Sequence, residues 1–361
     1  MNSEKESLKP GFFGALAFTD LGGLLVQLLG DAEGGRLACT LTVGLDGDTT
    51  VAQNQLLCRV ARGEAAMGQV LETYGHRTVG EMELAEPRYR ENPRQLDATL
   101  QSMRHGDRSP EQIHREQAKQ RAEVEKELPT LLAKWGGTSF REQIERSLRQ
   151  TQKVLAYRES GKHYLMMGYE LIRLAILELA RRWDLAREVF FLKLDELERF
   201  ESQREQLLET AAQRQVRWKS LQRLDMPEAI ESKRLDRLGL PRQYESAAEL
   251  KGVAIAAGVA TGTARIVFDP REPGELGPNY ILVCPSTDPG WTALFFHARG
   301  LIVEKGGVLS HGAIVARDFG IPAVVCPGAT QRIKDGSNLR LDGNRGMIYL
   351  EPAGERGKSQ G

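Results

Sequence analysis

The sequence has few cysteines and no surplus of charge of either sign. Four cysteines in 361 residues, none in a Cys-x-x-Cys pair, argue against a zinc site and against a disulfide framework, so we expect reduced thiols in a cytoplasmic protein. Lysine plus arginine (49) equals aspartate plus glutamate (49), giving a formal net charge of zero. We therefore expect no bulk attraction to nucleic acid or to an anionic membrane.

A long uninterrupted apolar run is also missing. The stretch that most resembles a targeting or membrane segment, 11–30, is broken by Thr19, Asp20 and several glycines, and no cleavage context follows it. We expect a turn plus a buried helix there.

Composition changes sharply along the chain, and this change predicts an α+β multidomain protein. Residues 108–240 are dense in Glu, Arg, Gln, Lys and Leu with few glycines, and apolar residues recur at three- and four-residue steps, which is typical of a helical bundle. Residues 250–350 are rich in Val, Ile, Gly and Pro, with short apolar runs between turn residues, which indicates a compact β/α domain.

These features predict four segments. An α-helical domain spans 1–240, a hinge linker with Gly, Pro and polar residues spans 241–250, a compact β/β/α domain spans 251–352, and 353–361 forms a disordered tail without an apolar anchor.

The most informative stretch surrounds His311. An apolar strand at 301–303 is followed by a glycine pair, by Ser310 as a good N-cap, and by a short helix that begins at His311 and ends near Gly320. A helix N-terminus offers free N–H groups and partial positive charge, so it stabilises an anion held on the first-turn imidazole without a metal. Imidazole is also a nucleophile near neutral pH. The alternative is a capping histidine in an ordinary strand–loop–helix unit.

Three segments, 288–292, 300–304 and 306–325, together resemble the swivelling phosphohistidine domain of phosphoenolpyruvate-utilising enzymes. The resemblance implies that His311 is the phosphorylated residue. With it, we expect Ser310, Gly307 and Thr287 to position the phosphate.

A second candidate pair lies in the helical region. Arg158 and Lys162 are four residues apart, so a helix places both cations on one face, where they suit a phosphate; the alternative is a solvated charged surface. The segments 157–162, 171–173 and 189–197 resemble the helical acceptor-binding domain of rifampicin phosphotransferases, which implies that both cations assist phosphoryl transfer.

The stretch 74–81 resembles the same helical domain. It makes His76 and Arg77 candidates for acceptor binding, although polar side chains in such a turn also satisfy buried backbone groups. For His163, in strongly polar surroundings, we expect a solvated helix position.

The resemblance also implies a missing part. Full-length relatives carry an ATP-grasp domain that phosphorylates the histidine, and neither that domain nor a Gly-x-x-x-x-Gly-Lys-Ser/Thr loop is found here. No carboxylate cluster suggests a metal site or a tightly bound cofactor, so we expect ATP and Mg²⁺ at the site of a separate ATP-grasp protein.

The resulting hypothesis is a phosphotransferase component, an enzyme that relays a phosphoryl group through His311 to a small acceptor near Arg158 and Lys162. Two alternatives stay open: a phosphocarrier or regulatory protein without a small acceptor, and a non-catalytic acceptor-binding protein. The acceptor, and whether ATP or phosphoenolpyruvate is the donor, are open.

Overall fold

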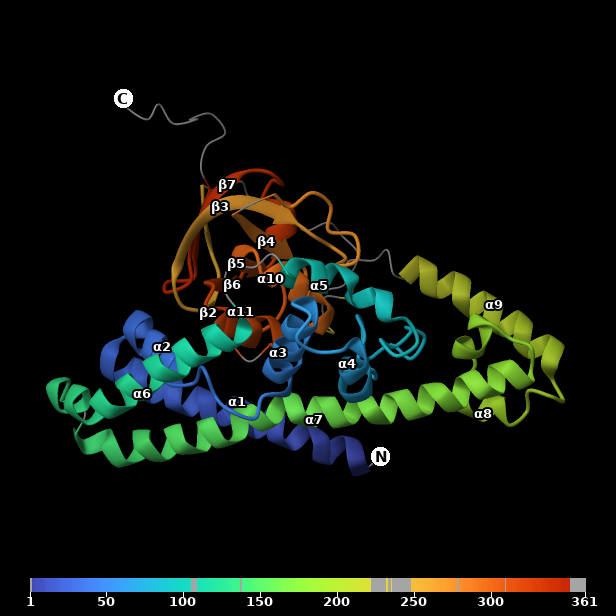
Figure 1. Cartoon of the computed structure of the whole chain (residues 1–361), viewed down its shortest axis with the longest axis horizontal. Coiled ribbons are helices and arrows are strands. Elements are labelled where there is room, and N and C mark those ends of the chain that lie inside the picture. Colours follow the sequence, from blue (N-terminus) through green and yellow to red (C-terminus); the bar gives the residue numbers. More distant parts are fainter. Residues whose placement is uncertain are drawn as a thin grey trace.

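The computed structural model describes residues 2–104, 109–136, 138–221, 248–277, 279–308 and 310–350, together with Ser232 and Leu235. The described part of the chain has two halves, a helical one and a mixed-sheet one, which rest against each other (Figure 1). The helices of the first half are α1 (Asn2–Leu29), α2 (Asp31–Thr40), α3 (Thr49–Ala61), α4 (Met67–Tyr74), α5 (Asp97–Arg104), α6 (Pro110–Lys134), α7 (Arg141–Arg182), α8 (Leu194–Leu197) and α9 (Arg204–Leu221), with 3₁₀ turns at Pro93–Leu96, Thr138–Phe140 and Arg187–Phe191.

The longest helix of the helical half is α7, which has 42 residues, and α1 packs along it (Figure 1). Leu21 and Leu25 of α1 are fully buried in a cluster that includes Ile144 and Leu148 of α7. The four-residue spacing within each pair places both side chains on one helix face. The turn expected within 11–30 is wrong, because α1 runs through this segment as one helix; the buried helix is confirmed.

The second half is one eight-stranded mixed sheet. Its strands are β1 (Glu249–Lys251), β2 (Val253–Ala256), β3 (Val259–Ile266), β4 (Tyr280–Cys284), β5 (Ala298–Val303), β6 (Ala323–Val325), β7 (Asn338–Asp342) and β8 (Met347–Leu350). The order is β1-β8-β7-β3-β4-β5-β6-β2, in which β3, β4, β5 and β6 run parallel and the other pairs are antiparallel. Three short helices connect these strands: α10 (Thr292–Phe295), α11 (His311–Phe319) and α12 (Ala329–Arg332), with a 3₁₀ turn at Pro289–Trp291 before α10.

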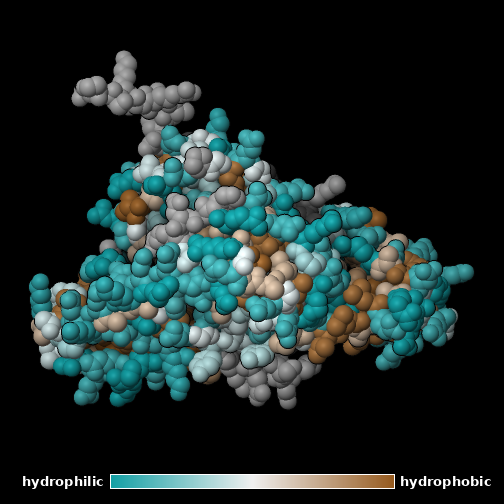
Figure 2. Space-filling view, viewed as in Figure 1, coloured by the Kyte–Doolittle hydropathy of each residue, from teal (hydrophilic) through white to brown (hydrophobic). Residues whose placement is uncertain are grey.

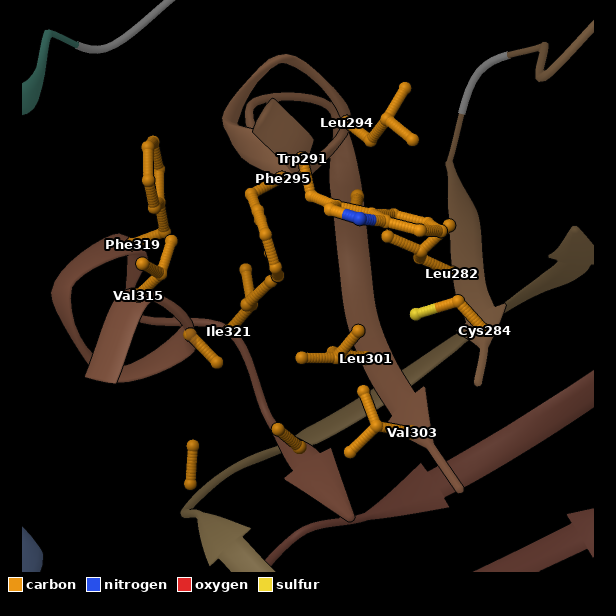
Figure 3. Packing of buried hydrophobic residues seen from close by; sticks show 14 of the residues in the cluster. Leu282, Cys284, Trp291, Leu294, Phe295, Leu301, Val303, Val315, Phe319 and Ile321 are labelled. Atoms are coloured by element: carbon orange, nitrogen blue, oxygen red, sulfur yellow. The ribbon is translucent and has the colours of Figure 1, made fainter. Parts of the chain in front are cut away.

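Alternation along the central strands separates two cores. Leu282 and Leu301 point to one face, where α10 and α11 cover them with Phe295 and Val315 (Figure 3). The next residue in a strand, such as Ile302, points into the other core. Because both faces are covered, the sequence of β4, and that of β5 from Gly300 onward, is a continuous apolar run rather than an alternating one.

The β5–α11–β6 unit places His311 at the end of a buried parallel strand. The predicted combination of a helical N-terminal region and a compact β/α domain is thereby confirmed. The first strand begins at Glu249, slightly before the boundary expected at 251, while most of the predicted linker 241–250 and all of the predicted tail 353–361 lie outside the described residues.

None of the helices in the described residues is both long and apolar enough to span a bilayer. Figure 2 shows a mainly hydrophilic face, on which apolar side chains gather toward the end of the molecule that carries α8 and α9.

Candidate functional site

His311 is the first residue of α11, as the sequence predicts. Ser310 is the N-cap: its backbone is extended (φ −64°, ψ 159°) and its Oγ accepts a hydrogen bond from the Ala313 amide at 3.3 Å. The helix ends at Gly320 in the left-handed conformation (φ 66°, ψ 30°), so both predicted ends are confirmed.

The His311 side chain is almost completely enclosed. It is 6% exposed, and neither ring nitrogen has a hydrogen-bond partner among the described residues. Burial lowers the pKa of His311 to about 4; the charge of Lys162 acts in the same direction, while that of Glu159 opposes it. The imidazole is therefore neutral at pH 7 and keeps a lone pair for nucleophilic attack.

A buried ionic cluster from the helical half faces His311. Glu81 accepts hydrogen bonds from Arg77 Nε at 2.5 Å and from Lys162 Nζ at 2.6 Å. Burial alone would raise the pKa of Glu81, but the charges of Arg77 and Lys162 hold it below its ordinary value. Nη1 of Arg77 is buried without a partner among the described residues. The cluster thus keeps one donor for an incoming anion.

The structure brings several of the predicted residues together. Lys162 and Arg77, which are far apart in sequence, share the carboxylate of Glu81, and the charges of all three act on His311. Arg158 lies one helical turn before Lys162 in α7, but its side chain lies outside the described residues.

His76 lies beside this cluster rather than on the surface. It is 1% exposed, and its ring meets that of His163 edge-on with the centroids 4.4 Å apart. Burial lowers the pKa of His76 to about 3, and the charges of His163 and Arg77 add to this effect. The solvated position expected for His163 is wrong: it is 9% exposed, because this face of α7 packs on the loop after α4.

The predicted phosphate-positioning residues surround the start of α11. Thr287 lies so close that a Cβ on Gly312 would be 2.5 Å from its Oγ1, so only glycine fits at that position. The carbonyl of Gly307 accepts a hydrogen bond from the Ser310 amide at 2.9 Å, which shapes the loop that precedes the helix.

Three acidic residues near the site were missed at the sequence level. Glu159 is 1% exposed and accepts a hydrogen bond from the Thr50 hydroxyl at 2.9 Å. The only sequence signal for Glu81 is its four-residue distance from Arg77. The third residue, Asp288, begins the segment 288–292, which carries part of the family resemblance. Its hydrogen bond with the Gly80 amide was not predicted.

Asp288 joins the two halves at the site. Its Oδ2 accepts a hydrogen bond from the Gly80 amide of the helical half at 2.9 Å, and its Oδ1 accepts one from the Gly290 amide at 2.8 Å. Burial raises the pKa of Asp288, although both hydrogen bonds oppose this. A Cβ on Gly290 would be only 2.2 Å from Cγ2 of Val79, so the backbones approach closely here.

A search of the described residues for metal ligands finds no group of three or more His, Cys, Asp or Glu side chains placed to hold an ion. The charged groups that act on His311 are instead two cations, Lys162 and Arg77, and two carboxylates, Glu81 and Glu159, and the ring lies at a helix N-terminus. This set is suited to a phosphoryl group.

Comparison with known proteins agrees with this geometry. Residues 276–346 match the mobile domain of PEP-utilising enzymes, and residues 53–159 match the fourth domain of rifampicin phosphotransferase. The chain is 30% identical over 308 residues to a rifampicin phosphotransferase of Streptomyces sviceus, covering 81% of this chain and 35% of that protein. A rifampicin phosphotransferase of a Streptomyces species is 32% identical over 307 residues, covering 80% of this chain and 35% of that protein.

A further relative is similar over a shorter range. The prodigiosin synthesizing transferase PigC of Serratia marcescens is 42% identical over 132 residues, which is 36% of this chain and 15% of that protein. The chain spans about a third of the length of the two rifampicin phosphotransferases. Its similarity is thus to phosphotransferases.

Proposed function

We propose that this chain, which carries the mobile domain of PEP-utilising enzymes and the fourth domain of rifampicin phosphotransferase, relays a phosphoryl group through His311. A separate ATP-grasp protein, with ATP and Mg²⁺ at its own site, loads the histidine. The mixed-sheet half, called the mobile half from here on, then returns to the helical half. There it delivers the group to a small hydroxylated acceptor near Arg158 and Lys162.

One observation carries this proposal: a buried, neutral imidazole, with neither ring nitrogen paired among the described residues, faces an ionic cluster that contains Lys162 and Arg77. An ordinary capping histidine would have a hydrogen-bond partner, because burying an unpaired polar group costs about 1–3 kcal/mol. The unpaired donor of Arg77 supports the same interpretation, since a phosphoryl oxygen on His311 would provide its missing acceptor.

The chemistry consists of two balanced displacements. In loading, a ring nitrogen of His311 attacks phosphorus, the P–N bond forms, the bond to the donor's leaving oxygen breaks, and the imidazole releases its ring proton. In delivery, the acceptor oxygen attacks phosphorus, the P–N bond breaks, and the imidazole takes up the hydroxyl proton. Lys162 and Arg77 stabilise the charge on the transferred oxygens in the loose transition state.

Labelling with radioactive ATP tests the carrier. Incubation with a cognate ATP-grasp protein should give a phosphoprotein that is labile in acid and stable in base, and His311→Ala should remove all label. Without the second protein, the chain should neither label itself nor bind ATP in calorimetry. Label on another residue, or self-labelling, would refute the relay.

The acceptor is tested in the second half-reaction. Rifampicin, the compound in the relatives' name, is the first probe, and its addition should release label from His311 into a small phosphorylated product. Label that stays on His311 with every hydroxylated small molecule tried would favour the phosphocarrier alternative.

A further inference from the structure

A second cleft lies between the two halves, and none of the candidate catalytic side chains lines it. A cavity of about 630 Å³ opens where α1 and α2 face β2 and the turn between β7 and β8. Figure 1 draws α2 and β2 close together. A neighbouring cavity of about 410 Å³ shares Arg36, Cys39 and Asn344 with it, so the two form one cleft. Each volume is within the range of small-molecule sites.

Glycines in α1 and α2 keep this cleft open. A Cβ on Gly22 or on Gly35 would meet no heavy atom within 4 Å, whereas one on Gly34 would be 2.5 Å from Val26. Gly34 is therefore required for the contact between the two helices, but Gly22 and Gly35 are not. Glycine weakens a helix by about 1 kcal/mol relative to alanine, so no local stability is gained by keeping Gly22 and Gly35.

The walls of the larger cavity are mostly apolar and come from both halves. Phe18 and Ala38 line it from the helical half, and Ile255 and Val308 line it from the mobile half. Val308 belongs to the loop that precedes His311. Because both halves supply walls, the cavity is complete only when the mobile half is docked.

The charged residues at the rim indicate the sign of the charge that a ligand would carry. Asp31 lies in the first turn of α2, where the helix dipole favours a carboxylate, and Arg36 pairs with Glu33. Arg345 is exposed; its amide donates to Oδ1 of Asp342 at 3.2 Å, and its guanidinium takes part in none of the ion pairs found among the described residues. An anionic group that enters the cleft could therefore form an ion pair with Arg345.

We propose that this cleft is a second binding site, for an apolar small molecule that carries one anionic group near Arg345. The site is separate from the acceptor position near Lys162, and its existence does not depend on the proposed relay. Anilinonaphthalene sulfonate, an apolar dye with one sulfonate group, is a suitable probe because its fluorescence rises on entering an apolar site.

Titration of the full chain with this dye should show saturable binding of one molecule per chain. Gly22→Leu and Gly35→Leu fill the cleft from two different helices, and each should weaken binding by about tenfold or more. Gly168→Leu is the matched control, because Gly168 is a helical glycine of α7 with equally open surroundings, and it should leave binding unchanged. Arg345→Ala should weaken binding by about fivefold.

Three outcomes would overturn the site: binding that does not saturate, equal binding by the wild type and both filling variants, or loss of binding in Gly168→Leu alone, which would place the dye on the exposed face of α7. Circular dichroism of each variant checks that the fold is kept. The titration needs neither ATP nor a second protein, so its failure is distinguishable from failure of the relay.

Discussion

His311 is buried and has no hydrogen-bond partner in the part of the chain that the structure describes, and this combination determines its protonation. A histidine held only by a carboxylate would have a raised pKa and be charged at pH 7, and it would then be a poor nucleophile. Here burial is the largest influence, and the two carboxylates, Glu159 and Glu81, oppose the two cations. In the proposed relay, the ionic cluster can therefore attract a phosphoryl group without protonating the imidazole that would receive it.

This protonation has a measurable effect on stability. The pKa of His311 is lowered from 6.5 to about 4, so the unfolded chain binds more protons than the folded chain between these values. The free energy of unfolding should therefore fall as the pH falls from 6.5 to 4, by up to about 3 kcal/mol for this group. Urea unfolding of the wild type and of His311→Gln should show this difference, and parallel pH profiles for the two proteins would contradict it.

Lys162 should separate loading from delivery. Lys162→Ala removes a cation that faces His311 only in the docked arrangement, so loading by the ATP-grasp protein should be nearly unchanged. Transfer of label to the acceptor should slow by roughly a hundredfold, as for loss of other charge-stabilising donors. Arg158→Ala should behave alike, and Lys153→Ala, an exposed lysine of the same helix, is the control. Equal loss of both half-reactions would contradict this division.

At the scale of single elements, α11 allows a test of whether Ser310, which caps the helix, also positions the phosphate. Ser310→Ala should lower the free energy of unfolding by about 1 kcal/mol, because the Ala313 amide loses its acceptor. Asparagine and aspartate both cap helices well, but only aspartate adds negative charge where the phosphoryl group arrives. Ser310→Asn should thus keep stability and loading, while Ser310→Asp keeps stability and slows loading. Similar loading by these two variants would show that Ser310 acts only as a cap.

The same elements show what the sequence can and cannot predict. The ends of α11 follow from adjacent residues, a serine cap and a terminal glycine, and were therefore predictable. The unbroken helix α1 was not, because burial of Leu21 and Leu25 outweighs the low helix propensity of the glycines between them. The carboxylates of Glu81 and Glu159 were missed for a related reason: the role of Glu81 depends on how the loop after α4 packs against α7, and that of Glu159 depends on how α3 packs against α7, which no local pattern encodes.

At the scale of the whole molecule, composition predicts two halves but not their contact. That contact includes Asp288, whose two oxygens accept from amides in different halves, the close approach of Gly290 to Val79, and a hydrogen bond from the Ser102 hydroxyl to the Ala293 carbonyl at 2.8 Å. It holds His311 against the ionic cluster and shields it from a second protein, since the ring is 6% exposed. If a separate partner loads His311, as proposed, this contact must open first.

A disulfide across this contact tests the requirement. A Cβ on Gly290 would be 3.0 Å from the Cβ of Val79, so a shift of about half an ångström allows a disulfide between cysteines at these positions. With the double substitution Val79→Cys and Gly290→Cys, the oxidised chain should resist labelling by the ATP-grasp protein, and reduction should restore it. Each single cysteine variant should label equally with and without reductant. Equal labelling of the oxidised and reduced double variant would show that the partner reaches His311 while the halves stay docked, and that no swing of the mobile half is needed.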